Sequence, residues 1–298
     1  MRRRNSENSS SVRNNVPSSI NQKVIDANVA VHTRLAAQYQ SCEPHFRPEN
    51  VAKVEQRLAA LVAETRAESL LDLGCGTGFM IAIAKPHLRR ITGVDVTPAM
   101  LERVDRSGPA KIELVNHDTG TYPAAPGAYQ VVTAYSFLHH LAEVGPTFRT
   151  AHRALAPGGK FYADLDPNFY FWDEIRRLKR DGGHDPIVAR EIEAVTFKDE
   201  EIEAKFGVPR ETFNHAEYGK DIAGGFEENA LRSQLLGAGF SRVEFHYHWF
   251  LGEGALINSG AAPREELLRQ ARTVSEALAK ALPVSRAMFK YLGFVATK

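Results

Sequence analysis

A glycine-rich turn followed by a carboxylate is the part of this sequence best suited to bind a nucleotide. The apolar segment 70–73 runs into a turn with three glycines: Gly74, Gly76 and Gly78. Residues without a Cβ let the backbone turn tightly and approach a ligand closely. The amides that begin a helix expected at 79–85 would point at that ligand. Asp95 ends a second apolar segment, and such a carboxylate can accept hydrogen bonds from the hydroxyls of a ribose.

The spacing of the glycines separates two classes of cofactor. A dinucleotide-binding turn has the pattern G-x-G-x-x-G, but Phe79 stands where its third glycine belongs, and Gly78 comes one residue early. Asp72 stands two residues before the first glycine, where its negative charge would repel a pyrophosphate. A cationic ligand suits this carboxylate better, and S-adenosylmethionine carries both a sulfonium and an ammonium group.

The glycine turn is similar to the first motif of class I S-adenosylmethionine-dependent methyltransferases. Asp118, in Asn116-His117-Asp118, matches the acid that accepts from the adenine amino group in this family. Residues 129–141 resemble the fourth-strand motif and its Leu-His-His-Leu ending, although Gln130 stands where the family usually has Asp. An ordinary loop acid is the alternative for Asp118.

Two later turns extend the resemblance. Ala156-Pro157-Gly158-Gly159-Lys160 resembles the turn before the fifth strand, and Leu236-Gly237-Ala238-Gly239-Phe240 resembles the approach to the sixth. The similarity covers residues 66–166 strongly and 226–298 more loosely. Several motifs in the same order at matching intervals make the resemblance specific.

The resemblance implies a set of residues around the cofactor, S-adenosylmethionine. They are Tyr39, Asp72, Gly74, Gly76, Gly78, Asp95, Val96, Met100, Asp118 and Tyr135. Tyr39 lies in a segment similar to the lid helix of small-molecule methyltransferases, where a tyrosine closes over the methionine end of the cofactor; packing on the sheet is the alternative. Met100 would cover the adenine, although a methionine in a helix is more often core filler.

His139 and His140 are the candidate catalytic residues. A neutral imidazole beside the methyl acceptor could remove its proton, because the ordinary pKa of histidine lies near neutral pH. The alternative is that the two histidines fix a loop. We predict no metal site here, because adjacent side chains point apart and no carboxylate or thiolate cluster accompanies them in the sequence.

Aromatic residues indicate where an acceptor would bind. Asn168-Phe169-Tyr170-Phe171-Trp172 follows the fifth predicted strand, where the family builds its acceptor pocket, and His45 lies in a segment bounded by prolines. Aromatic faces bury flat apolar molecules and stabilise nearby cations. A plain core cluster is the alternative for residues 168–172.

Apolar segments alternate with helical patterns through most of the chain, which is typical of a parallel sheet with helices on both faces. The strands are expected at 70–73, 90–95, 111–115, 130–135, 160–164, 241–249 and 288–297. The helices are expected at 24–39, 49–64, 79–85, 98–104, 146–155, 169–180, 186–206, 227–237 and 264–281. We therefore expect an α/β fold with a Rossmann-like, seven-stranded, mostly parallel sheet.

The same patterns divide the chain into parts. Residues 1–20 are polar and rich in Ser, Asn and Arg, which predicts a disordered tail. Residues 21–66 would form an N-terminal helical lid, and 67–298 a class I methyltransferase domain. Helical insertions are expected after the fifth strand, at about 167–225, and after the sixth, at about 250–286.

Composition narrows the possible partners. The net charge is +1, whereas proteins that bind nucleic acid usually have a basic excess. No apolar run approaches the roughly 20 residues that a membrane span requires. Cys42 and Cys75 are the only cysteines, so a reduced, cytoplasmic setting is expected.

By resemblance, the reaction is methyl transfer from S-adenosylmethionine to an O, N or C nucleophile, which releases S-adenosylhomocysteine. The fourth strand ends in Ala134-Tyr135-Ser136, not in the Asn/Asp-Pro-Pro-Tyr that the family uses for nucleobase or glutamine amide nitrogens. We therefore expect a small-molecule acceptor. The alternatives are a protein or RNA methyltransferase, a non-catalytic S-adenosylmethionine-binding protein, and a nicotinamide reductase, which Phe79 disfavours.

Overall fold

A computed structural model of the chain describes residues 18–194 and 196–298. Most of the predicted disordered tail therefore lies outside the described residues. Its predicted end was wrong, because Ser18 already begins the first helix, α1 (Ser18–Leu35).

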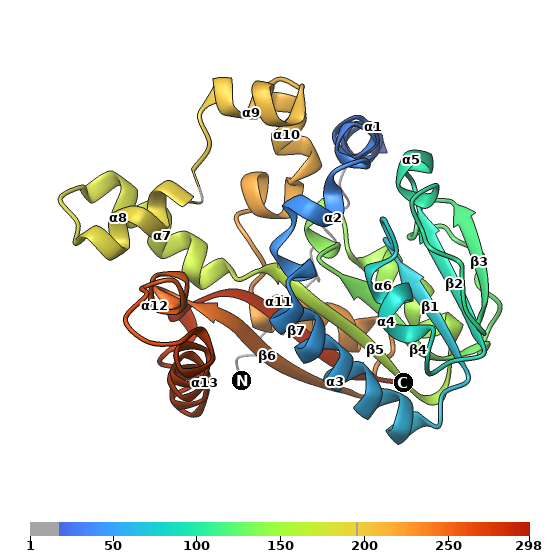
Figure 1. The fold of residues 1–298 in the computed structure, drawn as a ribbon. Coiled ribbons are helices and arrows are strands. Elements are labelled where there is room, and N and C mark those ends of the chain that lie inside the picture. The colour runs from blue at the N-terminus through green and yellow to red at the C-terminus, as the bar shows by residue number, and fades with distance from the viewer. Residues whose placement is uncertain (1–17, 195) are drawn as a thin grey trace, which may run out of the picture.

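Seven strands form one sheet in the order β3-β2-β1-β4-β5-β7-β6 (Figure 1). The strands are β1 (Ser69–Leu73), β2 (Arg90–Asp95), β3 (Lys111–Asn116), β4 (Tyr129–Tyr135), β5 (Leu155–Pro167), β6 (Arg242–Phe250) and β7 (Phe289–Thr297). Strands β1 to β5 pair in parallel, whereas β7 pairs antiparallel with both β5 and β6. The predicted mostly parallel α/β sheet is confirmed.

Helices occupy most of the segments between the strands, but none lies between β3 and β4. The α-helices after α1 are α2 (Tyr39–Cys42), α3 (Pro48–Thr65), α4 (Phe79–Ala84), α5 (Pro98–Leu101), α6 (Gly145–Ala154), α7 (Phe169–Asp181), α8 (Pro186–Ala194), α9 (Asp199–Phe206), α10 (Arg210–Ala216), α11 (Glu228–Gly237), α12 (Glu253–Ile257) and α13 (Arg264–Lys280). Short 3₁₀ or π segments are η1 (Pro44–Phe46), η2 (Leu138–His140), η3 (Tyr218–Ile222) and η4 (Arg286–Met288). Helices α7 to α10 lie between β5 and the approach to β6, and α12 and α13 lie between β6 and β7.

Two predicted helices were wrong in extent. The helix expected at 24–39 ends at Leu35, and Tyr39 begins the separate helix α2. The helix expected at 186–206 is divided into α8 and α9. The Glu201 side chain accepts a hydrogen bond from the backbone N–H of Lys198 at 2.7 Å, which caps a new helix start.

The sheet separates two hydrophobic cores because alternate side chains of a strand point to opposite faces. Leu70 of β1 packs in the core that contains α3 and α4, whereas Leu71 and Leu73 pack in the core that contains α6 and α11. All five residues of β1 are buried, as a strand covered on both faces requires.

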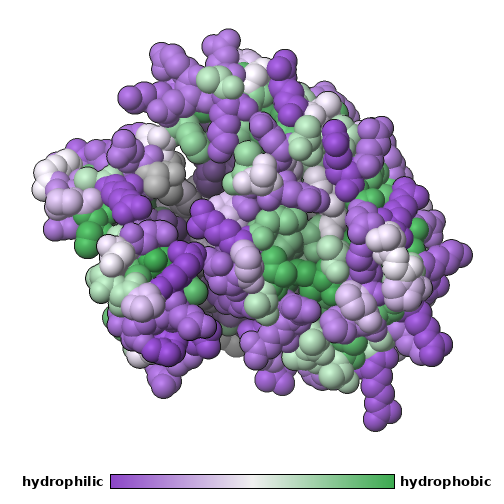
Figure 2. Space-filling view, in the orientation of Figure 1, coloured by the Kyte–Doolittle hydropathy of each residue, from purple (hydrophilic) through white to green (hydrophobic). Residues whose placement is uncertain are grey.

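A third cluster joins helices that are far apart in the sequence. Val31 and Leu35 of α1 pack with Phe206 of α9 and Phe213 of α10. Figure 1 shows α1 beside α5 and α10. The face in Figure 2 is mostly hydrophilic, with hydrophobic residues gathered near its middle. None of the helices in the described part of the chain is both long and apolar enough to cross a membrane.

Candidate active site

The glycine turn opens onto a cavity, here called the turn cavity. Most of the residues predicted to surround the cofactor line this cavity. They are Tyr39, Gly74, Gly76, Asp95, Val96, Met100, Asp118 and Tyr135. These residues come from α2, the β1–α4 turn, the end of β2 and its helix, the loop after β3, and the end of β4. The carboxyl ends of neighbouring parallel strands meet at one edge of a sheet, and ligands of α/β folds bind at that edge.

Asp95 joins the glycine turn to the end of β2. Its Oδ2 accepts from the Gly76 N–H at 2.9 Å, and its Oδ1 accepts from the Thr97 N–H at 2.8 Å. Burial raises the pKa of Asp95. An ionised carboxylate offers about four acceptor positions, so Asp95 can accept from two further donors, such as the hydroxyls of a ribose.

A glycine is required at position 74 because any side chain there would overlap with Phe137. The φ of Gly74 is +72°, and a Cβ there would lie 2.0 Å from the ring of Phe137. Phe137 follows β4 and also lines the turn cavity. The first glycine of the turn therefore lets the loop after β4 approach the loop after β1.

Two of the predicted cofactor residues do not line the cavity. Asp72 lies within β1, where its Oδ1 accepts from the Thr133 Oγ at 2.7 Å, and burial raises its pKa to about 7. The other carboxylate oxygen of Asp72 has no hydrogen-bond partner among the described residues. Gly78, with a φ of +88°, is the N-cap of α4. Both residues therefore flank the glycine turn without lining the cavity.

Asp118 lies in the loop after β3. Its Oδ1 accepts from the Gly120 N–H at 3.0 Å, and its Oδ2 accepts from the Thr121 hydroxyl at 3.2 Å. Met100, only 2% exposed, lines the same cavity. The contact of these two side chains with an adenine stays a prediction.

Helix α1 covers the turn cavity. Ile25, Asn28 and His32 of α1 line it, and the open volume is about 70 Å³. Sites for drug-sized ligands begin at roughly 300 Å³. In this conformation the helix closes most of the space that a nucleoside cofactor requires.

A second cavity, here called the histidine cavity, has a volume of about 290 Å³ and adjoins the first. The two cavities share five residues: His32, Tyr39, His45, Ser136 and His140. The histidine cavity is also lined by His139, Glu217, Lys220 and Tyr291. Burial lowers the pKa of His45 to about 4, so this shared side chain is neutral at pH 7.

His139 forms a buried pair with Asp166, which lies near the end of β5. The Nδ1 of His139 lies 2.8 Å from the Asp166 Oδ1, and the same oxygen accepts from the His139 backbone N–H at 3.0 Å. Burial opposes a charge on the imidazole, but the bond to Asp166 and the charge of Glu217 hold the pKa of His139 above its ordinary value. Since Nδ1 faces a carboxylate, Nδ1 carries the proton and Nε2 is left as an acceptor.

His140 is held differently. Its Nδ1 donates to the backbone carbonyl of Ala216 at 2.7 Å, and its own carbonyl accepts from Asn28 of α1 at 2.9 Å. Burial, and then the neighbouring His139 and His32, hold the pKa of His140 well below its ordinary value. This neutral ring therefore joins α1, the loop after β4 and α10.

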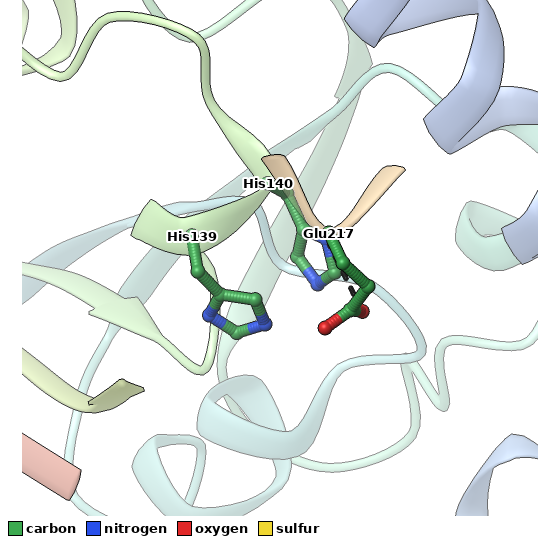
Figure 3. Close-up of side chains that lie close together, drawn as sticks. All are labelled: His139, His140 and Glu217. Carbon is green, nitrogen blue, oxygen red and sulfur yellow. Dashed lines mark ion pairs between the residues drawn. The ribbon is translucent and has the colours of Figure 1, made fainter. Parts of the chain in front are cut away.

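The expectation that the two histidines point apart was wrong. Their ring centres lie 4.1 Å apart with an interplanar angle of 42°, and Glu217 faces both (Figure 3). One ligand atom from each of these residues lies within 4.8 Å of the others, so a carboxylate does accompany them. However, the Lys220 ammonium lies 2.6 Å from Glu217. This internal cation already neutralises the carboxylate that a metal ion would need.

A second group of three possible ligands contains Asp164, His246 and His248. The Lys53 ammonium lies 2.6 Å from the Nδ1 of His248, and the Nε2 of His248 lies 3.0 Å from the Asp164 Oδ2. With Nδ1 accepting from Lys53, the proton lies on Nε2 and is donated to Asp164. A protonated Nε2 is a donor and cannot bind a metal ion.

The residues around His139 were not predicted from the sequence. Asp166 lies two residues after the fifth predicted strand, at the edge where parallel strands place functional residues, and this position is the signal that could have indicated it. Glu217 and Tyr291 had no such signal, because one belongs to an insertion and the other to the last strand. Of the aromatic segment 168–172, only Trp172 lines the histidine cavity. Asn168 is fully buried and fixes β7 through the Phe289 carbonyl.

Comparison with known proteins agrees with this geometry. The model of a family described as a methyltransferase domain matches residues 71–163. A solved S-adenosylmethionine-dependent methyltransferase from Mesorhizobium loti has the same fold, with a TM-score of 0.50 and 19% identity over 87% of this chain and all of that one. Residues 71–163 therefore match a methyltransferase domain, and the chain has the fold of a solved S-adenosylmethionine-dependent methyltransferase.

Two curated relatives are named as O-methyltransferases. The malonyl-[acyl-carrier protein] O-methyltransferase of Legionella pneumophila is 33% identical over 41% of this chain and 47% of its own length. The ubiquinone biosynthesis O-methyltransferase of Saccharophagus degradans is 26% identical over 49% of this chain and 64% of its own length. The chain thus spans less than two thirds of the length of both relatives.

The residues that line the turn cavity suit S-adenosylmethionine chemically. Asp95 can accept from two further hydroxyls, and Gly76 presents no Cβ to the cavity. Phe79 and Tyr135 supply aromatic walls with ring centres 4.8 Å apart. Phe79 fills the position of the third glycine in a dinucleotide turn, as the sequence indicated. The glycine turn of this chain therefore differs from that of the nicotinamide enzymes.

Proposed function

We propose that this methyltransferase transfers a methyl group to the hydroxyl or amine of a small molecule held in the histidine cavity, and that His139 removes the proton. The observation that carries the proposal is the His139–Asp166 pair: His139 lines the histidine cavity, and its ring lies 4.1 Å from that of His140, which lines both cavities. S-adenosylmethionine supplies an electrophilic methyl group on its sulfonium when it is bound.

The residues of the turn cavity would hold this cofactor. We assign the ribose hydroxyls to Asp95, the adenine amino group to Asp118, and the covering of the adenine to Met100. We assign Tyr39 to the methionine end, because it lines both cavities.

His139 is the better of the two histidines for proton transfer. Asp166 fixes its Nδ1–H, which leaves Nε2 as the acceptor for a proton from the substrate. The imidazolium that forms is stabilised by the carboxylates of Asp166 and Glu217. His140 is bound to the Ala216 carbonyl and lies next to His139, so we assign it a positioning role.

A small acceptor suits the histidine cavity better than a macromolecule. Its volume of about 290 Å³ and its aromatic walls, which include Trp172, Phe213 and Tyr291, match the size and character of small-molecule sites. The names of the relatives favour an oxygen nucleophile. Two free cysteines, Cys42 and Cys75, fit a reducing compartment, and we place the protein in the cytoplasm.

We also propose that residues 21–66 act as a lid on the domain formed by residues 67–298. Asn28 of α1 donates to the His140 carbonyl, and the His32 ring lies 4.7 Å from that of His140. Opening α1 would widen the turn cavity, and closing it would restore these contacts beside the acceptor. Closure that excludes water and aligns two reactants has a catalytic reason.

Calorimetry with S-adenosylhomocysteine tests the cofactor assignment. We expect binding in the micromolar range and no binding of NAD or NADP; the reverse preference would contradict the assignment.

Amide exchange tests the lid. S-adenosylhomocysteine should slow exchange across residues 21–48, and unchanged exchange there would exclude a lid that closes on the cofactor. Radiolabelled methyl transfer to a panel of hydroxyl and amine compounds then tests turnover.

A further inference from the structure

A third cavity lies between helix α3 and the sheet. This α3 cavity has a volume of about 360 Å³ and is lined by Lys53 and Arg57 of α3, by Tyr135 and Asp164 of the sheet, and by His248 of β6. Tyr135 also lines the turn cavity. The α3 cavity is therefore a neighbour of the site where a methyl group would be transferred.

The wall between the α3 cavity and the histidine cavity has an unusual backbone. Leu165 and Trp249 line both cavities, with φ angles of +63° and +56°. Ser136, which lines both the histidine cavity and the turn cavity, has a φ of +50°. Side chains with a Cβ rarely adopt this conformation, and such residues cluster at functional sites. The strained residues turn the chain where the cavities meet.

Positive charge is gathered on the helix side of the α3 cavity. Lys53 and Arg57 are four residues apart, so they lie on one face of α3, where like charges repel. In the described part of the chain, no carboxylate lies within ion-pair distance of either side chain. Asn50 and Gln56 of the same helix add neutral hydrogen-bonding groups. An anion would relieve the repulsion between the two cations.

The one carboxylate in the lining is already satisfied. Asp164 Oδ2 accepts from the Tyr162 hydroxyl at 2.6 Å and from His248 at 3.0 Å, and Oδ1 accepts from the Leu165 N–H at 2.7 Å. His246 lies 3.2 Å from Oδ2 on the buried side. The Lys53 ammonium reaches a neutral ring nitrogen of His248, and Glu253 of α12 acts on it only through its charge. Two cations therefore face a single, internally bonded carboxylate.

We propose that the α3 cavity binds an anionic group, a carboxylate or a phosphate, of the methyl acceptor through Arg57 and Lys53. The proposal rests on the proposed function, because the reacting end of the acceptor would lie in the histidine cavity, beyond Leu165 and Trp249. The guanidinium of Arg57 can form two parallel hydrogen bonds to a carboxylate or phosphate, and Lys53 adds a point charge. The acceptor is thus an acidic small molecule with a hydroxyl or amine at its other end.

Binding of inorganic phosphate and of malonate tests the charge recognition. Calorimetry on the full chain should detect at least one of the two anions, and the tighter of them identifies the group. Arg57→Gln should weaken that binding by at least about tenfold, because a charged hydrogen bond is lost. Arg272→Gln, on the exposed face of α13, removes the same charge elsewhere and should leave binding unchanged. Equal affinity of Arg57→Gln and the unaltered protein, or no binding of either anion, would overturn the proposal.

A second comparison links the anion to the acceptor. With S-adenosylhomocysteine bound, 4-hydroxybenzoate should bind more tightly than its methyl ester, and Arg57→Gln should remove the difference. An unaltered protein that shows no preference for the acid would refute the assignment of the α3 cavity to the acceptor. Binding of S-adenosylhomocysteine is measured in the same samples. Its failure would count against methyl transfer itself, whatever the anions do.

Discussion

The turn cavity and the histidine cavity share five residues but are built in opposite ways. The core of the turn cavity comes from one short stretch of chain, in which Asp95 accepts from the backbone of Gly76 and Thr97. The histidine cavity combines Tyr39, His139, Glu217 and Tyr291, which come from both ends and the middle of the chain. A strand–turn–helix–strand unit can encode cofactor binding locally, whereas acceptor chemistry depends on inserted helices that pack against the sheet.

The largest change in the rate of methyl transfer should come from His139, which we expect to act in proton transfer and not in cofactor binding. His139→Ala should reduce methyl transfer by about 10²–10⁴-fold, the usual contribution of a general base, and should leave the affinity for S-adenosylhomocysteine unchanged. Single-turnover assays and calorimetry measure the two quantities. His87→Ala, an exposed histidine, is the matched control. A parallel loss of cofactor affinity in His139→Ala would mean that cofactor binding and proton transfer are not confined to separate cavities.

Asp95→Ala should show the reverse behaviour. Losing hydrogen bonds to a charged group costs about 1.5–3 kcal/mol each, so the Kd of S-adenosylhomocysteine should rise by roughly a hundredfold. Asp118→Ala should cost less, because one bond to a neutral adenine amine would be lost. Calorimetry on both variants measures the Kd of S-adenosylhomocysteine and shows which substitution weakens binding more. An Asp118→Ala variant that binds more weakly than Asp95→Ala would contradict the assigned orientation of the cofactor.

Gly219 tests whether the insertion positions the base. A Cβ at Gly219, in the π segment η3, would lie 2.7 Å from the Cα of His139. Gly219→Ala should therefore push η3 away from His139 and lower the rate of transfer by about tenfold, since misplacement by ~1 Å can cost about a hundredfold. Gly237→Ala is the control, because a Cβ at Gly237 meets no atom within 4 Å. An unaffected rate in Gly219→Ala would show that η3 does not hold the base.

The smallest effect is a change in pH dependence. A base must be neutral to accept a proton, so activity should fall as the pH drops below the raised pKa of His139. Glu217→Gln removes a negative charge that favours the imidazolium, which lowers this pKa. The acid limb of kcat/KM should therefore move to lower pH, by about 1 unit for a charge at this range. If the acid limb of kcat/KM does not move in Glu217→Gln, the titration belongs to a group other than His139.

The α3 cavity extends the same comparison. It is lined by residues of α3, of the ends of β4 and β5, and of β6, and no local pattern of residues indicates that these elements meet. Lys53 and Arg57 look like an ordinary solvated helix face in the sequence, and only the packing of α3 against the sheet brings them to Asp164 and His248.

The sequence by itself determined the sheet and indicated most of the residues that line the turn cavity. Strand alternation, the glycines of the turn and the carboxylate of Asp95 act over short distances along the chain, so their types and spacing already fix their geometry. Leu-His-His-Leu likewise identified the histidines, because the motif follows a strand whose end lies at the binding edge.

Only the tertiary structure decided how those histidines are used. His139 meets Asp166 from the next strand, and His140 meets the carbonyl of Ala216. Such contacts join residues that are up to 76 positions apart. Their distances, burial and charges arise when the inserted helices pack against the sheet, and no local pattern of residues specifies that packing.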